Sequence, residues 1–121
     1  MMYSATVAPP YSMVVVEDSA GGELPDFMEG SVVFSSESCI VVCCLMSADG
    51  DTTFTLGQAD EVDPGTAPLF QGKLETPSRR ITIKTVENKT FLEAPVSQIS
   101  TTVRIWVNRA KEPDRVIVGI E

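Results

Sequence analysis

Residues 38–53 read SCIVVCCLMSADGDTT and contain the longest apolar run of the chain, CIVVCCLM at 39–46. Successive side chains of a β-strand point to opposite faces, so a continuous apolar run predicts a strand that is covered on both faces. The Asp49-Gly50 dipeptide that follows is typical of a hairpin turn. We therefore expect residues 39–47 to form a central strand and TTFTL at 52–56 to return beside it as a hairpin.

Short β-prone runs separated by turn residues continue in both directions from this stretch. The run RRITIKTV at 79–86 alternates apolar and polar residues, and Glu87-Asn88 predicts a tight turn into KTFLEA at 89–94. Further strands are expected at 11–18, 31–36, 69–76, 101–108 and 115–121. Turn signals recur about every ten residues, without a long helical period, which is typical of sandwiches and barrels. The sequence thus predicts an all-β, single-domain antiparallel β-sandwich of about eight or nine short strands.

Three segments are expected to lie outside these strands. Residues 1–10, which end in Pro9-Pro10, are interpreted as a flexible N-terminal leader that precedes the sandwich domain at 11–121. Residues 57–68 are rich in glycine, proline and acids, which predicts neither a helix nor a central strand. Residues 19–31 are expected to be a long loop, with room for a helical turn at 25–28 that tucks Phe27 and Met28 inward.

Three cysteines lie within six positions of the apolar run. On a strand, Cys39 and Cys43 would share a face about 13 Å apart at ~3.3 Å per residue, well beyond the ~7 Å between Cα atoms that a disulfide allows. Cys44 would point to the opposite face from Cys43. A zinc site usually takes four Cys and His ligands from loops, and this chain has no histidine. We therefore interpret the three cysteines as small buried apolar side chains, which agrees with a reducing compartment.

Enzymatic and cofactor-binding motifs are missing from the sequence. Without histidine there is no Ser-His-Asp or Cys-His arrangement and no histidine acid or base. No glycine-rich phosphate-binding motif occurs, and no apolar run is long enough to span a bilayer. The first residues lack the basic and apolar regions of a signal peptide. We expect a cytoplasmic, non-enzymatic protein with no cofactor, no membrane partner and no nucleic-acid partner.

Charge is distributed unevenly along the chain. Residues 1–72 contain 11 acids and no Lys or Arg, whereas residues 73–121 contain 9 basic residues and 6 acids, so the two parts carry −11 and +3 and sum to −8. Such asymmetry indicates either an acidic binding surface for a basic protein or simply a soluble surface. We expect the contact to involve the acids of residues 17–63, and the candidate interface residues are Asp49, Asp51, Asp60, Glu61 and Asp63. As carboxylates they are also candidate Ca²⁺ ligands.

Trp106 is the only tryptophan, and it shares the polar parity of its strand with Arg104 and Asn108. An exposed tryptophan is a frequent anchor of protein interfaces. The alternative is that a loop or a second sheet covers this face, in which case Trp106 belongs to the core. Both interpretations stay open from the sequence.

The order and spacing of four stretches resemble a known family. They are YSMVVVED at 11–18, EGSVVFSSESCIVVCCLM at 29–46, KLETPSRRITIKTVENKTFLEAP at 73–95 and TTVRIWVNRAKEPDRVIVGIE at 101–121. Together they resemble the bacterial competence protein J family, from about residue 11 to the end of the chain. The resemblance implies an all-β domain that binds a protein, as a small inhibitor of a DNA-entry nuclease.

The functional expectation is therefore a non-enzymatic protein-binding module that contacts a basic partner, with a nuclease as the leading candidate. Its contacts are expected at the five acids above, with Trp106 as an anchor if it is exposed. Two alternatives remain: a structural assembly protein that associates through its edge strands, for which a homo-oligomer is expected, and a calcium- or carbohydrate-binding sandwich that uses the loops at 49–63.

Overall fold

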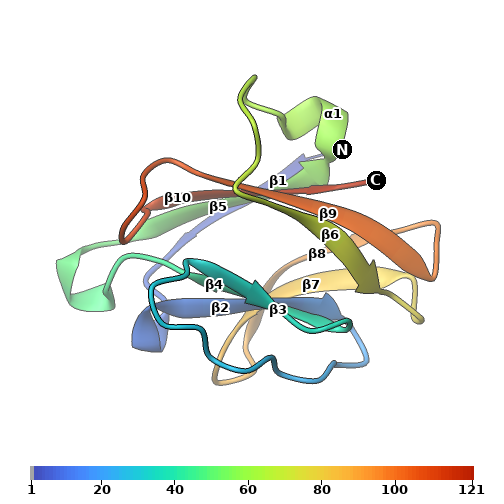
Figure 1. Ribbon diagram of the computed structural model, residues 1–121, viewed down its shortest axis with the longest axis horizontal. Coiled ribbons are helices and arrows are strands. Elements are labelled where there is room, and N and C mark those ends of the chain that lie inside the picture. Colours follow the sequence, from blue (N-terminus) through green and yellow to red (C-terminus); the bar gives the residue numbers. More distant parts are fainter. Residues whose placement is uncertain (1) are drawn as a thin grey trace.

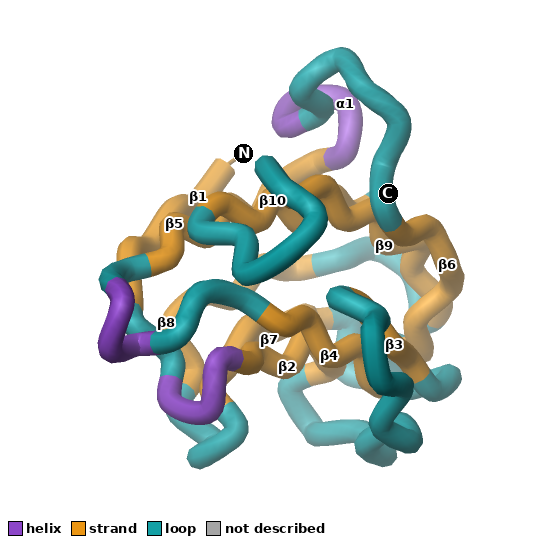
Figure 2. Tube along the Cα trace, turned by 60° about the vertical axis from the view of Figure 1, so that its left-hand side comes forward, coloured by secondary structure: helices purple, strands orange, loops and turns teal. Residues whose placement is uncertain are grey.

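The computed structural model describes residues 2–121, which form two five-stranded sheets that pack face to face (Figure 1; Figure 2). Sheet A has the strand order β1-β5-β10-β9-β6, and sheet B has the order β3-β4-β2-β7-β8. The strands are β1 (Met2–Val7), β2 (Met13–Asp18), β3 (Val33–Ser35), β4 (Cys39–Cys43), β5 (Thr52–Gln58), β6 (Phe70–Glu75), β7 (Arg80–Thr85), β8 (Thr90–Pro95), β9 (Ser100–Val107) and β10 (Arg115–Ile120). Two 3₁₀ turns, η1 (Pro10–Ser12) and η2 (Ser47–Asp49), and one short helix, α1 (Ala59–Val62), complete the described elements.

The predicted all-β sandwich is confirmed, with two differences in detail. The described residues contain ten strands, where about eight or nine were expected. Sheet A is mixed, because β10 runs parallel to β5 with Val116 opposite Phe54, whereas β10 and β9 are antiparallel. A parallel pair cannot be joined by a tight turn, so local sequence signals do not reveal it.

The predicted hairpin between residues 39–47 and 52–56 is wrong. Both segments are strands, but β4 belongs to sheet B and β5 to sheet A. The turn at Asp49-Gly50 carries the chain from one sheet to the other, and the amides of Leu45 and Thr53 bond the carbonyls of Pro113 and Asp114. Asp49-Gly50 does lie in a turn. The two strands that it joins lie in opposite sheets, where each buries its apolar side chains in the core and pairs with other strands.

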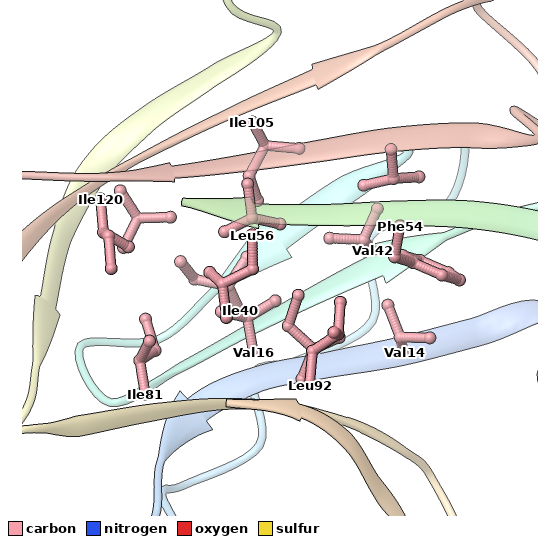
Figure 3. Packing of buried hydrophobic residues seen from close by; sticks show 14 of the residues in the cluster. Val14, Val16, Ile40, Val42, Phe54, Leu56, Ile81, Leu92, Ile105 and Ile120 are labelled. Atoms are coloured by element: carbon pink, nitrogen blue, oxygen red, sulfur yellow. The ribbon is translucent and has the colours of Figure 1, made fainter. Parts of the chain in front are cut away.

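Apolar side chains from the two sheets meet between them and form the core (Figure 3). In sheet A, Phe54 and Leu56 of β5 point inward, and in sheet B the inward residues include Ile40 and Val42 of β4. The predicted hairpin of β7 and β8 is confirmed, with Ile81 opposite Ala94 and Ile83 opposite Leu92. The alternating pattern of these strands therefore predicted which residues enter the core.

The prediction that residues 39–47 form a strand covered on both faces is confirmed for β4, whereas Met46 and Ser47 lie beyond the strand and are exposed. Ile40 and Val42 face sheet A, while Cys39 and Val41 lie in a second buried cluster with Val15 and Phe34 on the outer face of sheet B. The connection between β2 and β3 runs along that outer face (Figure 1). A loop, rather than a third sheet, thus provides the outer cover.

The expected flexible leader is instead an edge strand. Residues 2–7 form β1, which pairs antiparallel with β5, so that Val7 lies opposite Thr52. Tyr3, Ala5 and Val7 pack against the core, and the residues between them are exposed. Residues 2–7 do alternate apolar and polar side chains in the sequence, but the segment is short. It forms a strand because it pairs with the neighbouring β5.

A one-turn helix, α1, lies in the segment where no helix was expected. Ala59 and Val62 are buried while Asp60 and Glu61 face solvent, so packing against β5 and β10 stabilises the turn. An isolated helix of four residues has too few hydrogen bonds to persist by itself. Among the described residues, no helix is both long and apolar enough to cross a membrane.

Candidate protein-binding surfaces

The five predicted interface acids do not form one cluster. All five are exposed. Asp49 and Asp51 flank the turn that joins β4 to β5, whereas Asp60, Glu61 and Asp63 lie in and after α1, and Figure 1 shows these two segments well apart. Among the described residues, no group of three or more Cys, Asp or Glu side chains could hold a metal ion. The loops at 49–63 therefore do not make the single carboxylate site that a calcium-binding protein would need.

Asp63 also stabilises its own loop. Its Oδ1 accepts a hydrogen bond of 2.7 Å from the Gly65 amide, and Gly65 has a φ of 90°. This is the side-chain-to-backbone bond that aspartate commonly makes in turns. Part of the acidic character of residues 57–68 thus follows from backbone geometry.

Trp106 is buried, with an exposed fraction of 4%. Its indole Nε1 donates a 2.9 Å hydrogen bond to the Thr66 carbonyl. A Cβ built on Gly119 would come within 2.9 Å of the indole and 3.0 Å of the Ala59 Cα, so glycine is needed for this close packing. The segment at 59–68 therefore covers this part of sheet A, and the core interpretation of Trp106 is the one that the geometry supports.

Two acids of the N-terminal part of the chain are buried. Glu17, with a side chain 7% exposed, forms an ion pair with Lys84 of the neighbouring strand β7. Asp18 accepts bonds of 2.9 Å from the amides of Ala20 and Ser78, which ties the end of β2 to the turn before β7. These carboxylates have structural partners and are not available to a binding surface.

The two sheets also redistribute the asymmetry of charge along the chain. Strands from residues 1–72 lie at β1-β5 in sheet A and at β3-β4-β2 in sheet B. Across the core, β5 contacts β8, and β4 contacts β6. N-terminal strands of one sheet thus face C-terminal strands of the other, so the molecule is not divided into an acidic and a basic half. What remains of the asymmetry is confined to individual loops.

One such loop has exposed apolar side chains that the sequence analysis did not predict. Residues 23–30, ELPDFMEG, which we call the acidic apolar loop, lie between β2 and β3. The exposed fractions are 69% for Leu24, 69% for Phe27 and 57% for Met28. The three acids of the loop, Glu23, Asp26 and Glu29, are exposed as well. The expected helical turn at 25–28 is absent from this described loop, and the prediction that Phe27 and Met28 tuck inward is wrong.

The N-terminal end of the acidic apolar loop is held firmly. The Glu23 amide donates a 2.9 Å bond to Ser38 Oγ, and Ser36 Oγ donates a 2.5 Å bond to the Glu23 carbonyl. Gly22 packs so closely that an added Cβ would lie 2.0 Å from the Ser38 carbonyl oxygen. Phe27 makes an edge contact with Phe34, with ring centroids 5.6 Å apart and an interplanar angle of 80°. Phe34 is buried in the outer cluster of sheet B, whereas Phe27 contacts its ring edge-on and stays 69% exposed.

The cysteines are free thiols in an apolar environment. Cys39 and Cys44 are buried, and Cys43 is half-buried. Burial raises the pKa of Cys39 to about 12 and that of Cys44 to about 11, and it also raises the pKa of Cys43. At neutral pH all three are therefore protonated, which makes them poor nucleophiles and poor metal ligands.

Comparisons with known proteins give a match at the level of structure. No known family and no curated protein matches the sequence. The crystal structure of ComJ from Bacillus subtilis, an inhibitor of the DNA-degrading activity of NucA, superposes with a TM-score of 0.72 at 11% identity, covering 99% of this chain and 97% of ComJ. A protein described as crocagin biosynthetic gene J superposes with a TM-score of 0.52 at 12% identity, with the same coverage of both chains. Over its whole length this chain has the fold of ComJ, as its resemblance to the competence protein J family implied.

Proposed function

We propose that this protein is a non-enzymatic inhibitor that binds a nuclease and blocks its action on DNA. The observation that carries the proposal is the full-length match to the fold of ComJ, a nuclease inhibitor. The net charge of −8 supports it, because a nuclease needs positive charge to hold the phosphate backbone of DNA. Opposite charges accelerate association and favour the correct orientation of the two proteins.

The experiment is affinity capture of the tagged protein from a lysate of its own host, at low and at high salt. The captured fraction is assayed for degradation of DNA in a gel, after the inhibitor has been removed by denaturation. We expect one basic nuclease, retained at low salt and released at high salt. Titration of the purified nuclease with this protein should abolish DNA degradation near a 1:1 ratio.

The control is an unrelated acidic protein of similar size and net charge, carried through the same steps. It separates specific inhibition from simple competition between acidic molecules. If nucleases are retained equally by both proteins, or if excess protein leaves the purified nuclease fully active, the proposal is wrong.

A further inference from the structure

The acidic apolar loop is the place where exposed apolar and acidic side chains coincide. Its eight residues contain Leu24, Phe27 and Met28, all more than half exposed, together with three exposed acids and no basic residue. Exposed large apolar side chains that gather in one segment mark interaction sites more often than scattered ones do. Aromatic side chains in particular contribute much of the binding energy of interfaces.

A second pair of exposed apolar residues, Tyr11 and Met46, lies in surroundings of mixed charge. Tyr11 and Met46 are 71% and 50% exposed, and their turns, η1 and η2, contact each other. The chain there also meets the turn between β9 and β10 through the bond from Leu45 to Pro113, and that turn carries Arg109 and Lys111. These cations would repel a basic partner. The residues of the acidic apolar loop carry carboxylates and no cation, and Lys84, which lies beside Leu24, is paired with Glu17.

We propose that the acidic apolar loop is the element that enters the nuclease, and that it occupies the cationic groove in which the nuclease holds DNA. This inference rests on the proposed function above. Grooves that bind single strands combine basic side chains for the phosphates with apolar or aromatic surfaces for the bases. In the loop, the exposed Asp26 and Glu29, which flank Phe27 in the sequence, supply negative charge, and the exposed Phe27 ring supplies the flat apolar surface.

The attachment of the loop favours tight binding. The bonds of Glu23 to Ser36 and Ser38 use only its backbone groups, so its carboxylate is left for the partner. The edge contact of Phe27 with Phe34 orients the ring before the partner arrives. A loop that is already ordered loses less conformational freedom when it binds. Because the loop would take the place of DNA, the inhibition should be competitive with DNA.

The first test compares two loop variants with matched controls, using the nuclease recovered in the capture experiment. The charge variant is Glu23→Lys/Asp26→Lys/Glu29→Lys. Its control, Glu75→Lys/Glu87→Lys/Glu112→Lys, changes the net charge by the same amount at exposed acids that belong to no candidate interface. The apolar variant is Phe27→Ala, and its control is Ile99→Ala, where the side chain is 63% exposed. Thermal unfolding of all four checks that they are folded.

We expect both loop variants to bind at least roughly 30-fold more weakly, as at an interface hot spot, and the apolar control to stay within about threefold of the wild type. The charge control should lose only the long-range attraction that salt screens, so at physiological salt it should bind at least roughly tenfold more tightly than the charge variant. If the loop variants bind as tightly as the wild type, this inference is overturned while the proposed function stands. If the wild type binds no nuclease, the proposed function fails and the inference fails with it.

The second test locates the loop on the nuclease. A fluorescent phosphorothioate oligonucleotide, which resists cleavage, is bound to the nuclease and titrated with this protein. We expect the wild type to displace the oligonucleotide completely and Phe27→Ala to need a correspondingly higher concentration. A stable complex of nuclease, inhibitor and oligonucleotide would overturn the placement in the DNA groove.

Discussion

Trp106 and Thr66 are joined by a 2.9 Å hydrogen bond from the indole Nε1 to the backbone carbonyl, which fastens the loop after α1 to strand β9. The bond explains how the outer face of an antiparallel strand pair can bury a tryptophan without a third sheet. Because Trp106 is the only tryptophan, its fluorescence reports on this single contact.

Replacing the indole should release the loop. We expect Trp106→Phe to lower the free energy of unfolding by about 1 kcal/mol, since one hydrogen bond is lost. Limited proteolysis should then cut faster at residues 63–68. Thr66→Ala is the control, because it keeps the carbonyl that accepts the bond. Equal cleavage of both variants would show that the bond does not hold the loop.

The ion pair of Glu17 and Lys84 should be strongly coupled, because the side chains are only 7% and 15% exposed. Glu17→Gln or Lys84→Met alone leaves one charge poorly solvated, at a cost of about 3 kcal/mol. The double variant should cost clearly less than the sum of the two, as measured by urea unfolding. The exposed pair of Arg80 and Glu93 is the control, and Glu93→Gln should have no measurable effect. Additive costs at Glu17 and Lys84 would contradict the coupling.

The buried thiols should make the protein less stable at alkaline pH. Cys39 and Cys44 have native pKa values of about 12 and about 11, above their unfolded value of 9.0. Between about pH 9 and 11 the unfolded chain loses thiol protons that the native state keeps, so stability falls by about 1.4 kcal/mol per pH unit for each thiol. Below pH 9 this contribution is fully present.

Urea unfolding under reducing conditions, at pH 8 and at pH 10.5, measures this loss. Other groups titrate in the same range, so the wild type is compared with Cys44→Ala, whose stability should fall less steeply with pH. If the free energy of unfolding fell equally with pH in both proteins, the loss of stability would not come from the raised pKa of Cys44.

The edge strand β1 should be required for stability. Ala5 packs against the core whereas Ser4 is exposed and contacts Thr55 at the surface. We expect Ala5→Asp to destabilise the protein by about 2 kcal/mol or more, because it desolvates a charge, and to lower the melting temperature by roughly 4 °C for each kcal/mol. Ser4→Asp should be nearly neutral. If residues 1–10 were a flexible leader, neither substitution would matter.

Local patterns sufficed where a strand and its partner are close in sequence. The hairpin of β7 and β8 was predicted because Ile81 and Ile83 alternate with polar residues and a two-residue turn follows. Strands were also predicted at 101–108 and 115–121, and the structure pairs them as the antiparallel neighbours β9 and β10. Their register depends on neighbours that the sequence itself supplies, so little had to be known of the rest of the molecule.

The predictions failed where contacts with distant segments determine which strands pair and which side chains are buried. Asp49-Gly50 indicated a hairpin, but β5 found its neighbours in β1 and β10 instead. Phe27 and Met28 were expected to turn inward, but both stay exposed, while Phe34 takes a buried position in the outer cluster of sheet B. The missed loop had a signal in the sequence, three acids and three large apolar residues without helix or strand period, although that signal did not say which side faces solvent.

The sequence by itself determined the strand segments other than β1, that the domain is all-β, and that its charge is strongly negative, because alternation, turn residues and composition are local properties. Only the tertiary structure decided which strands pair, that Glu17, Asp18 and Trp106 are buried, and that the acidic apolar loop is left outside. Pairing and burial depend on contacts between residues far apart in the chain, and the free energy of closing one core selects among locally equivalent arrangements.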